Sequence, residues 1–298
     1  MSNTARLNEA AECEKKAEEC MKTSMLKLKL KPDLDGAASA MERAAVCYKN
    51  SQEQKKAANA LIKAAGYYEQ NRNLFHAAKA RESAAVFLRD LKDFGEAVKL
   101  FELAIDGYAE SGSLDTAAMT VEKAAECLKI DDPKKALDIY QKGLSLVQQS
   151  DRAKMAGQFL NKITKLNLQL GNYKDAMHSI REEVEKYLEV KELPRIGQLA
   201  IALVLVNLAN EGDSVAALKD YSWVVNQVPD IQTTEDGRVC ESLIANFENG
   251  DDQSFQNVLK CGALRSMDNE YLRLMKTLKA PETGGKNDDD EENDDDLR

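Results

Sequence analysis

The sequence predicts an all-α protein, a right-handed α-solenoid of helical hairpins followed by a C-terminal helical bundle. Three observations favour this fold class. Charged residues make up 31% of the 298 residues and aromatic residues only 6%, a composition more typical of helices than of a β-sandwich or barrel. Alanine-rich segments of helical length recur at a constant step. This repeat fades beyond Tyr187, where we expect the bundle to follow.

The repeat is clearest in five segments of twelve residues. Most copies have small residues at the first, second and eighth positions and end on an aromatic residue or leucine. These copies begin at Ala37, Ala57, Ala77, Ala97 and Ala117, and weaker copies begin at Ala136, Ala156 and Ala176, with turn signals such as Gly112, Asp132-Pro133 and Gly171-Asn172 between units. A step of 20 residues holds one helix and a turn, so two steps make a TPR-like hairpin of about 40 residues.

Small residues on one face let neighbouring helices approach closely, so each hairpin is expected to pack on its neighbours. We therefore predict a twisted sheet of antiparallel helices over residues 1–190 and a bundle over 191–280, joined near the sequence VKELPRIGQ. The predicted core of the bundle comprises Ile201, Leu203, Leu205, Trp223, Val225, Leu243, Phe247, Phe255 and Leu259.

A segment of different composition interrupts the repeat near its start. The copy beginning at Ala10 lies 27 residues before Ala37, and the extra residues include KTSMLKLKLKPD over 22–33. Its leucines could fold back on the first hairpin. Alternatively the segment is a membrane-attachment loop, in which apolar side chains enter a bilayer surface and lysines meet anionic headgroups. The residues of this interpretation are Met25, Leu26, Lys27, Leu28 and Lys29.

The net charge of −10 is concentrated in the last residues of the chain. From Glu282 onward nine acidic residues stand against Lys286 and Arg298, which leaves a charge of only −3 for residues 1–281. Such a segment has almost no apolar surface to offset the entropy of ordering. We therefore predict a disordered acidic tail over 281–298 that orders only on a basic partner.

The cysteines and the apolar segments predict a cytoplasmic protein. The six cysteines, residues 13, 20, 47, 127, 240 and 261, form no CxxC pair and are interpreted as reduced core thiols. No signal peptide precedes the repeats, and the longest apolar run, Leu199 to Val206, is far shorter than the roughly 20 residues of a membrane span.

Nothing in the sequence predicts catalysis. His76 and His178, the only histidines, lie within helical repeats, and no GxxxxGK[ST], GxSxG or HExxH motif occurs. No Cys/His spacing suits zinc, and Asp131-Asp132 is interpreted as a helix cap before a proline. We expect no catalytic residue, no metal, no cofactor and no nucleic-acid partner.

Several phrases together resemble the soluble NSF attachment proteins, or SNAPs, over residues 5–298. They are KPDLDGAAS (31–39), FHAAKA (75–80), DTAAM (115–119), SMDNEY (266–271) and the ending DDDLR, and they look more like the gamma type than the alpha and beta types. The resemblance implies an adaptor of vesicle transport and membrane fusion, peripherally bound to membranes. Such adaptors coat a SNARE complex of syntaxin-type helices with their concave face, and their C-terminal end recruits the hexameric ATPase NSF.

The repeat register predicts where a SNARE bundle would bind. Position 7 of the unit is basic in five copies (Arg43, Lys63, Lys123, Lys142 and Lys162), and Lys79 stands one turn earlier in another copy. Because successive helices face opposite ways, Arg43, Lys79, Lys123 and Lys162 are expected on one face and the other two on the opposite face. The alternative is that these charged residues only form the solvent-exposed face of each helix. Lys162 matches a SNARE-binding lysine of the alpha type, whereas Met119 and Gln158 stand where that type has lysine, which implies weaker or differently tuned binding of SNAREs.

The resemblance also implies an NSF-binding end. Glu248, Asp251, Asp252 and the penultimate Leu297 would meet basic N-terminal domains of the ATPase. Asp251 and Asp252 follow Asn249-Gly250, so a turn and a helix start is the alternative interpretation of those two residues.

A different class of function also fits a helical repeat. The chain could be a general TPR-like scaffold that binds a peptide or a chaperone tail in its concave groove. The opening loop and Leu297 favour the SNARE adaptor, since a peptide-groove scaffold needs neither.

Overall fold

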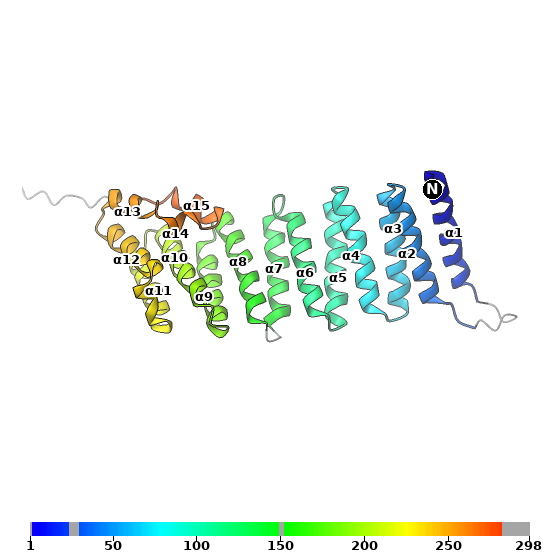
Figure 1. Ribbon diagram of the computed structural model, residues 1–298, viewed down its shortest axis with the longest axis horizontal. Helices are drawn as coiled ribbons and strands as arrows, with labels where there is room; N and C mark the ends of the chain where they lie inside the picture. Colours follow the sequence, from blue (N-terminus) through cyan, green and yellow to red (C-terminus); the bar gives the residue numbers. More distant parts are fainter. Residues whose placement is uncertain (1, 24–29, 149–151, 282–298) are drawn as a thin grey trace, which may run out of the picture. The chain divides into compact units, whose positions relative to one another are not determined.

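The computed structural model describes residues 2–23, 30–148 and 152–281 (Figure 1). These residues form fifteen α-helices and one short 3-10 helix, and no strand occurs among them. The chain divides into two compact units, residues 1–166 and 167–298. The predicted all-α fold class with TPR-like hairpins is confirmed.

The first unit is a row of antiparallel helices in chain order. They are α1 (Asn3–Met21), α2 (Leu34–Asn50), α3 (Gln54–Gln70), α4 (Leu74–Asp90), α5 (Phe94–Glu110), α6 (Leu114–Leu128), α7 (Pro133–Gln148) and the first part of α8 (Ala153–Leu170). From α1 to α7 each helix contacts the next. The predicted copies coincide with these helices, because from Ala37 onward the first alanine of each copy is the fourth residue of its helix.

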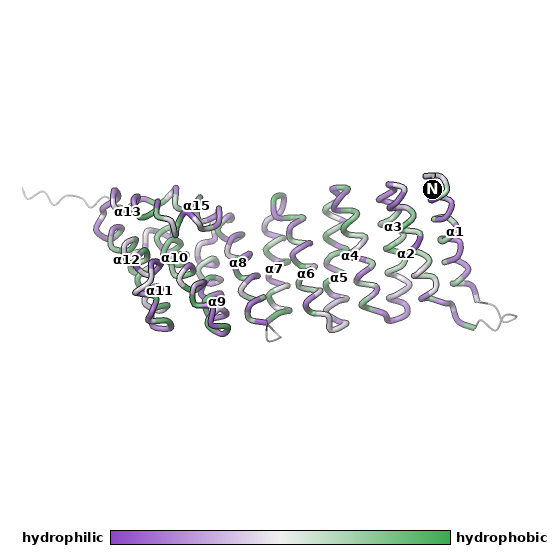
Figure 2. Tube along the Cα trace, in the orientation of Figure 1, coloured by the Kyte–Doolittle hydropathy of each residue, from purple (hydrophilic) through white to green (hydrophobic). Residues whose placement is uncertain are grey.

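Alanine makes this close packing possible. The alanines that begin the copies are almost fully buried between neighbouring helices. Where one helix carries alanine, larger side chains of the next, such as Phe101, Ile105 and Tyr108 of α5, fill the space. Figure 2 shows the result as hydrophobic positions that recur along each helix between hydrophilic ones.

The turns between α2 and α6 are three residues long and share one conformation. Their middle residues are Gln52, Arg72, Lys92 and Gly112, with φ of 62°, 58°, 63° and 79°. In this left-handed region the Cβ of a non-glycine residue lies too close to the backbone, which is unfavourable, whereas glycine has no Cβ. Three of the four turns therefore carry a small backbone strain.

We expect Lys92→Gly to raise the free energy of unfolding by up to about 1 kcal/mol, because it relieves the left-handed strain without removing a side-chain contact. Gly112→Ala is the matched opposite change, since nothing lies within 4 Å of the added Cβ and only the φ of 79° opposes it. It should lower stability by about 1 kcal/mol. Urea unfolding followed by far-UV circular dichroism measures both; a destabilised Lys92→Gly would contradict the explanation.

The second unit is organised around one central helix. It contains α9 (Tyr173–Glu189), α10 (Leu193–Ala209), α11 (Ser214–Gln227), η1 (Pro229–Thr233), α12 (Glu235–Glu248), α13 (Asp252–Val258), α14 (Gly262–Arg265) and α15 (Asn269–Met275). Helix α10 contacts α9, α11, α12 and α15. This explains the long apolar run of the sequence, since every residue from Leu199 to Leu208 is buried.

The unit boundary lies earlier in the chain than the boundary near residue 190 that the repeat register indicates. Buried residues of α9, such as Ala176, Ile180 and Val184, belong to the same core as those of α10. The predicted bundle core is buried except for Trp223 and Val225, which are half-buried at its edge. None of the helices in the described ranges is long and apolar enough to cross a membrane.

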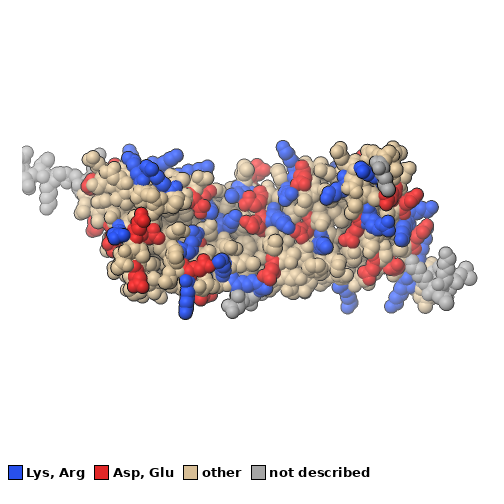
Figure 3. Space-filling model, in the orientation of Figure 1, with Lys and Arg blue, Asp and Glu red and all other residues tan. Residues whose placement is uncertain are grey.

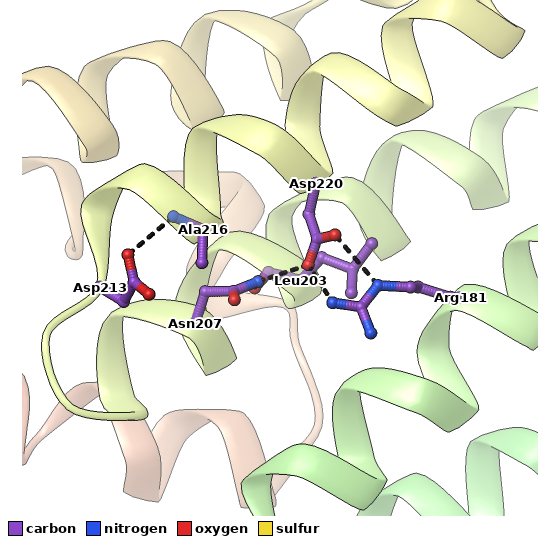
Figure 4. Close-up of polar contacts among 6 residues, drawn as sticks. All are labelled: Arg181, Leu203, Asn207, Asp213, Ala216 and Asp220. Carbon is purple, nitrogen blue, oxygen red and sulfur yellow. Dashed lines mark hydrogen bonds and ion pairs between the residues drawn. The ribbon is translucent and has the colours of Figure 1, made fainter.

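A buried polar network joins three helices of this unit (Figure 4). Arg181 of α9 donates two hydrogen bonds to the carboxylate of Asp220 on α11, at 3.0 and 2.7 Å. Asn207 of α10 donates to the same carboxylate at 2.7 Å and to the carbonyl of Leu203 at 2.9 Å. The side chain of Asp220 is only 10% exposed. Each partner satisfies a group that the apolar core would otherwise leave unsatisfied.

Four of the six cysteines, residues 13, 47, 127 and 240, are buried, and Cys20 and Cys261 are half-buried. Burial raises the pKa of the Cys240 thiol, because the apolar surroundings disfavour the thiolate. Asp132 caps α7 by accepting a hydrogen bond from the backbone of Lys135 at 3.0 Å, as the sequence predicts.

Candidate functional site

Ion pairs between alternate helices divide the first unit into two faces. Lys123 of α6 pairs with Glu82 of α4 at 2.5 Å, and Lys162 of α8 pairs with Glu122 of α6 at 3.0 Å. On the opposite face, Lys142 of α7 pairs with Asp106 of α5 at 2.5 Å. We call the surface formed by α2, α4, α6 and α8 the even-helix face. The predicted parity of the helices therefore agrees with these contacts.

The four predicted SNARE-binding cations differ in their surroundings. Arg43 and Lys79 are exposed, and within the described part of the chain neither takes part in an ion pair. Lys123 and Lys162 share the even-helix face, but the two glutamates already compensate their charges. The uncompensated positive charge of the stripe thus lies toward α2 and α4.

Tyrosines of the intervening helices hold two of the glutamates on this face. The hydroxyl of Tyr108 donates to Glu82 at 2.6 Å, and that of Tyr68 donates to Glu42 at 3.0 Å. Burial raises the pKa of the Tyr108 hydroxyl, and the hydrogen bond to Glu82 raises it further. Lys123 is consequently the outer member of a chain from Tyr108 through Glu82.

The basic positions of the repeat do not by themselves indicate these glutamates, although the sequence carries a signal for them. Glu42, Glu82 and Glu122 recur every 40 residues, one position before the basic position of the unit. Because successive helices face opposite ways, residues that recur every second unit lie on the same face. Pairing of position 6 in one hairpin with position 7 in the next could therefore be inferred from the sequence.

A groove of about 550 Å³ lies on the even-helix face between α2 and α4. Its apolar lining comes from Ala45, Val46, Leu61, Val86 and Phe87, and its polar lining from Glu42, Lys49, Ser83 and Asp90. Val46 is 56% exposed, and Met119 of α6 is 62% exposed. This face therefore offers apolar as well as charged contacts.

The predicted NSF-binding acids of the described residues lie where α12 meets α13, and we call Glu248, Asp251 and Asp252 the acidic edge. Asp251 caps α13 by accepting a hydrogen bond from the backbone of Ser254 at 2.9 Å. Hydrogen bonds from Ser254 also hold the pKa of the Asp251 carboxyl below its usual range. The turn and helix start proposed as the alternative is thus present, with Gly250 at a φ of 69°.

Asp252 also binds the end of the described chain. Its Oδ1 accepts hydrogen bonds from the backbone of Ala280 at 2.9 Å and from the side chain of Gln256 at 3.2 Å. Residue 281, from which the acidic tail continues, is therefore close to the acidic edge. Glu248 is exposed, and Leu297 lies outside the described residues. The structure thus places the end of the described chain beside the acidic edge, through a contact between residues 28 positions apart in the sequence.

The predicted membrane-attachment loop lies between α1 and α2. A hydrogen bond from the backbone of Asp33 to the carbonyl of Cys20 at 2.9 Å closes its base. Leu30 is 72% exposed. Met25, Leu26, Lys27, Leu28 and Lys29 lie outside the described residues.

Both histidines have local partners. His76 Nδ1 is 2.9 Å from the Oδ1 of Asn73, the residue that caps α4. The exposed His178 is 3.1 Å from Glu182, one turn away. In the described ranges, no three His, Cys, Asp or Glu side chains are grouped so that they could hold a metal ion.

A family model described as "Soluble NSF attachment protein, SNAP" matches residues 5–270. The chain belongs to the SNAP family. Two relatives named "Gamma-soluble NSF attachment protein" support the gamma-type resemblance. The relative from Dictyostelium discoideum is 21% identical over 282 residues, which cover 93% of this chain and 86% of that protein. The relative from Arabidopsis thaliana is 23% identical over 259 residues, 83% of this chain and 84% of that one.

Solved structures similar to this SNAP share little sequence with it. The crystal structure of BtubC from P. vanneervenii is 16% identical with a TM-score of 0.40, and covers 78% of this chain and 93% of its own. The apo form of RapI is 14% identical with a TM-score of 0.36, and covers 90% of this chain and 99% of its own.

Proposed function

We propose that this SNAP binds assembled SNARE complexes and recruits the NSF ATPase for their disassembly in vesicle transport and membrane fusion. The observation that carries the proposal is the family match over residues 5–270. The protein acts as an adaptor, and the chemical step belongs to NSF. Two surfaces on the chain suit the two partners.

The even-helix face is the surface proposed for the SNARE bundle. An acidic bundle is attracted by positive charge that has no compensating partner, and Arg43 and Lys79 supply such charge. The groove between α2 and α4 adds apolar contacts beside them. Because two other cations of the stripe are compensated, we propose a grip concentrated on the first hairpins.

The acidic edge and the tail are the surface proposed for NSF. Acidic side chains attract the basic N-terminal domains that the family resemblance implies for that ATPase. Glu248 supplies charge from α12, and Asp252 fixes the origin of the tail through Ala280. Leu297 would add one apolar contact at the far end of this acidic segment.

The proposal is tested by retention of NSF on immobilised SNARE complexes. We expect NSF to be retained only when both the assembled SNARE complex and this protein are present. Retention without this protein, or no retention with it, would exclude the adaptor role. Binding to single extended SNARE peptides as tight as to the assembled complex would instead support a general peptide scaffold.

Glu248→Lys separates the NSF surface from the fold, because this exposed side chain has no capping or tethering contact. It should lower NSF retention by roughly fivefold while SNARE binding is unchanged. The matched control is Glu185→Lys on the exposed side of α9, which should leave retention unchanged. Leu297→Ala should leave retention nearly intact but lower stimulated ATP hydrolysis. Equal effects of the two lysine variants would contradict the assignment of the acidic edge.

We also propose that the loop over residues 22–33 attaches the protein peripherally to the cytoplasmic face of membranes. Replacing Met25 and Leu26 by serine should reduce binding to anionic vesicles several-fold and leave the melting temperature unchanged, because apolar insertion supplies much of the affinity. The control pair is Val215→Ser and Leu218→Ser, exposed apolar residues of α11. Vesicle cosedimentation measures binding; a large drop in melting temperature would show that Met25 and Leu26 pack on the first hairpin.

A further inference from the structure

The last described segment carries a surface of uncompensated positive charge. We call its five exposed members, Lys260, Arg265, Arg273, Lys276 and Lys279, the C-terminal basic surface. Within the described residues none of them takes part in an ion pair. From Lys260 to Lys279 the sequence contains only two acids, Asp268 and Glu270. Figure 3 shows basic side chains gathered along the edge formed by α13 to α15.

Packing of the apolar side chains sets the direction of these cations. Tyr271, Leu274, Met275 and Leu278 are buried in the core of the second unit. Arg273, Lys276 and Lys279 follow one another at intervals of three residues and remain exposed on the outer side. The core therefore holds the cations outward.

Two hydrogen bonds fix the end of this segment. Gln256 of α13 donates to the carbonyl of Leu278 at 2.9 Å, and the backbone of Ala280 donates to Asp252 at 2.9 Å. The basic surface and the origin of the tail are thus held on the same compact unit. Immediately beyond it, residues 282–298 contain nine acidic residues.

We propose that the acidic tail, residues 282–298, docks on the C-terminal basic surface of its own chain and covers it from other anionic partners. Charge complementarity carries the assignment, since a net charge of −7 follows a surface whose five cations are uncompensated. The tail is also tethered beside that surface, and a short flexible tether gives an effective concentration on the order of millimolar.

The length of the tail allows this contact. Asp288 is eight residues beyond Ala280, and an extended chain of that length reaches about 26 Å at roughly 3.3 Å per residue. Helix α15 has seven residues and is therefore only about 10 Å long. The acids from Asp288 to Asp296 can consequently reach every part of α15. An anionic lipid surface has the same charge but no tether, so the tail is favoured as the occupant.

Zero-length carbodiimide crosslinking of the full chain tests the contact directly. At low salt, tail carboxylates should crosslink to Lys260, Lys276 and Lys279 at least about fivefold more than to Lys191 and Lys219, because tethering raises their local concentration. Those two control lysines are exposed on the same unit and belong to no ion pair in the described part of the chain. The preference should disappear at about 0.5 M salt, where charge interactions are screened.

Mixing isotope-labelled and unlabelled chains identifies the source of each crosslink. Crosslinks within one chain support the proposal. Mixed crosslinks in equal amount would show that the tail binds a second copy, and equal yields at all five lysines would show that it has no preferred surface. Either result would overturn the proposal.

Vesicles containing phosphatidylserine test whether the tail covers the surface. Replacing the acids of 288–296 by Asn and Gln should increase vesicle binding about tenfold, because the cations become accessible to anionic lipid. Adding Lys276→Gln and Lys279→Gln to that variant should remove most of the gain, which excludes a simple effect of net charge. Vesicle binding of the unaltered chain equal to that of the tail variant would show that the basic surface is not covered.

Discussion

Replacing Asp220 with alanine is expected to lower the free energy of unfolding of the second unit by about 3 kcal/mol. The carboxylate accepts hydrogen bonds from both Arg181 and Asn207. Its removal leaves the guanidinium without its counter-charge and Asn207 with one bond fewer at a buried position. Buried polar groups without a hydrogen-bond partner lower the stability of the folded state.

Urea unfolding followed by the fluorescence of Trp223, the only tryptophan, reports on this unit. Asp213→Ala on the same helix removes only the cap bond to Ala216 at 2.8 Å and should cost about 1 kcal/mol. Lys219→Ala, an exposed neighbour, should stay within about 0.5 kcal/mol. If Asp220→Ala cost no more than Asp213→Ala, the three-helix network would contribute little to stability.

Reversing the charges of Arg43 and Lys79 to glutamate is expected to weaken binding to an assembled SNARE complex by at least about tenfold. Both side chains are exposed and belong to no ion pair within the described residues, so their charge is available to an acidic partner. The loss should be larger at low salt, where screening is weak. Fluorescence anisotropy of a labelled complex measures it.

Lys63 of α3 and Lys134 of α7 provide the matched control, because both are exposed and neither belongs to an ion pair within the described residues. Their reversal should change the affinity by less than about twofold. Equal losses for the two pairs would show that the even-helix face is not the SNARE surface. Lys123 and Lys162 are less suitable for this test, since reversal would place two carboxylates together on the fold.

The helical repeat could be predicted because its signal is local. Small residues at the first, second and eighth positions of the clearest copies encode the close approach of neighbouring helices, and each copy corresponds to one helix. The boundary between the units could not be predicted in the same way. Whether α9 joins the core before it or after it depends on how Ala176 and Ile180 pack, and both belong to the second core.

The candidate surfaces, too, could be predicted from the sequence only in part. The parity of basic positions follows from the register alone, so Lys123 and Lys162 could be assigned to one face from the sequence. Their compensation by Glu82 and Glu122 depends on contacts between residues about 40 positions apart. Composition likewise predicts the acidic tail, whereas its origin beside Asp252 is a long-range contact through Ala280.

The fold class, the helix positions, the family and the clustering of charge near the end of the chain follow from the amino-acid sequence, because they depend on periodicity and composition within short segments. Which cations remain uncompensated depends on how the helices pack. Arg43, Lys79 and the C-terminal basic surface have no ion-pair partner among the described residues, while other lysines do. The physical reason is that ion pairing acts over a few ångströms, a distance that the fold sets between residues far apart in the chain.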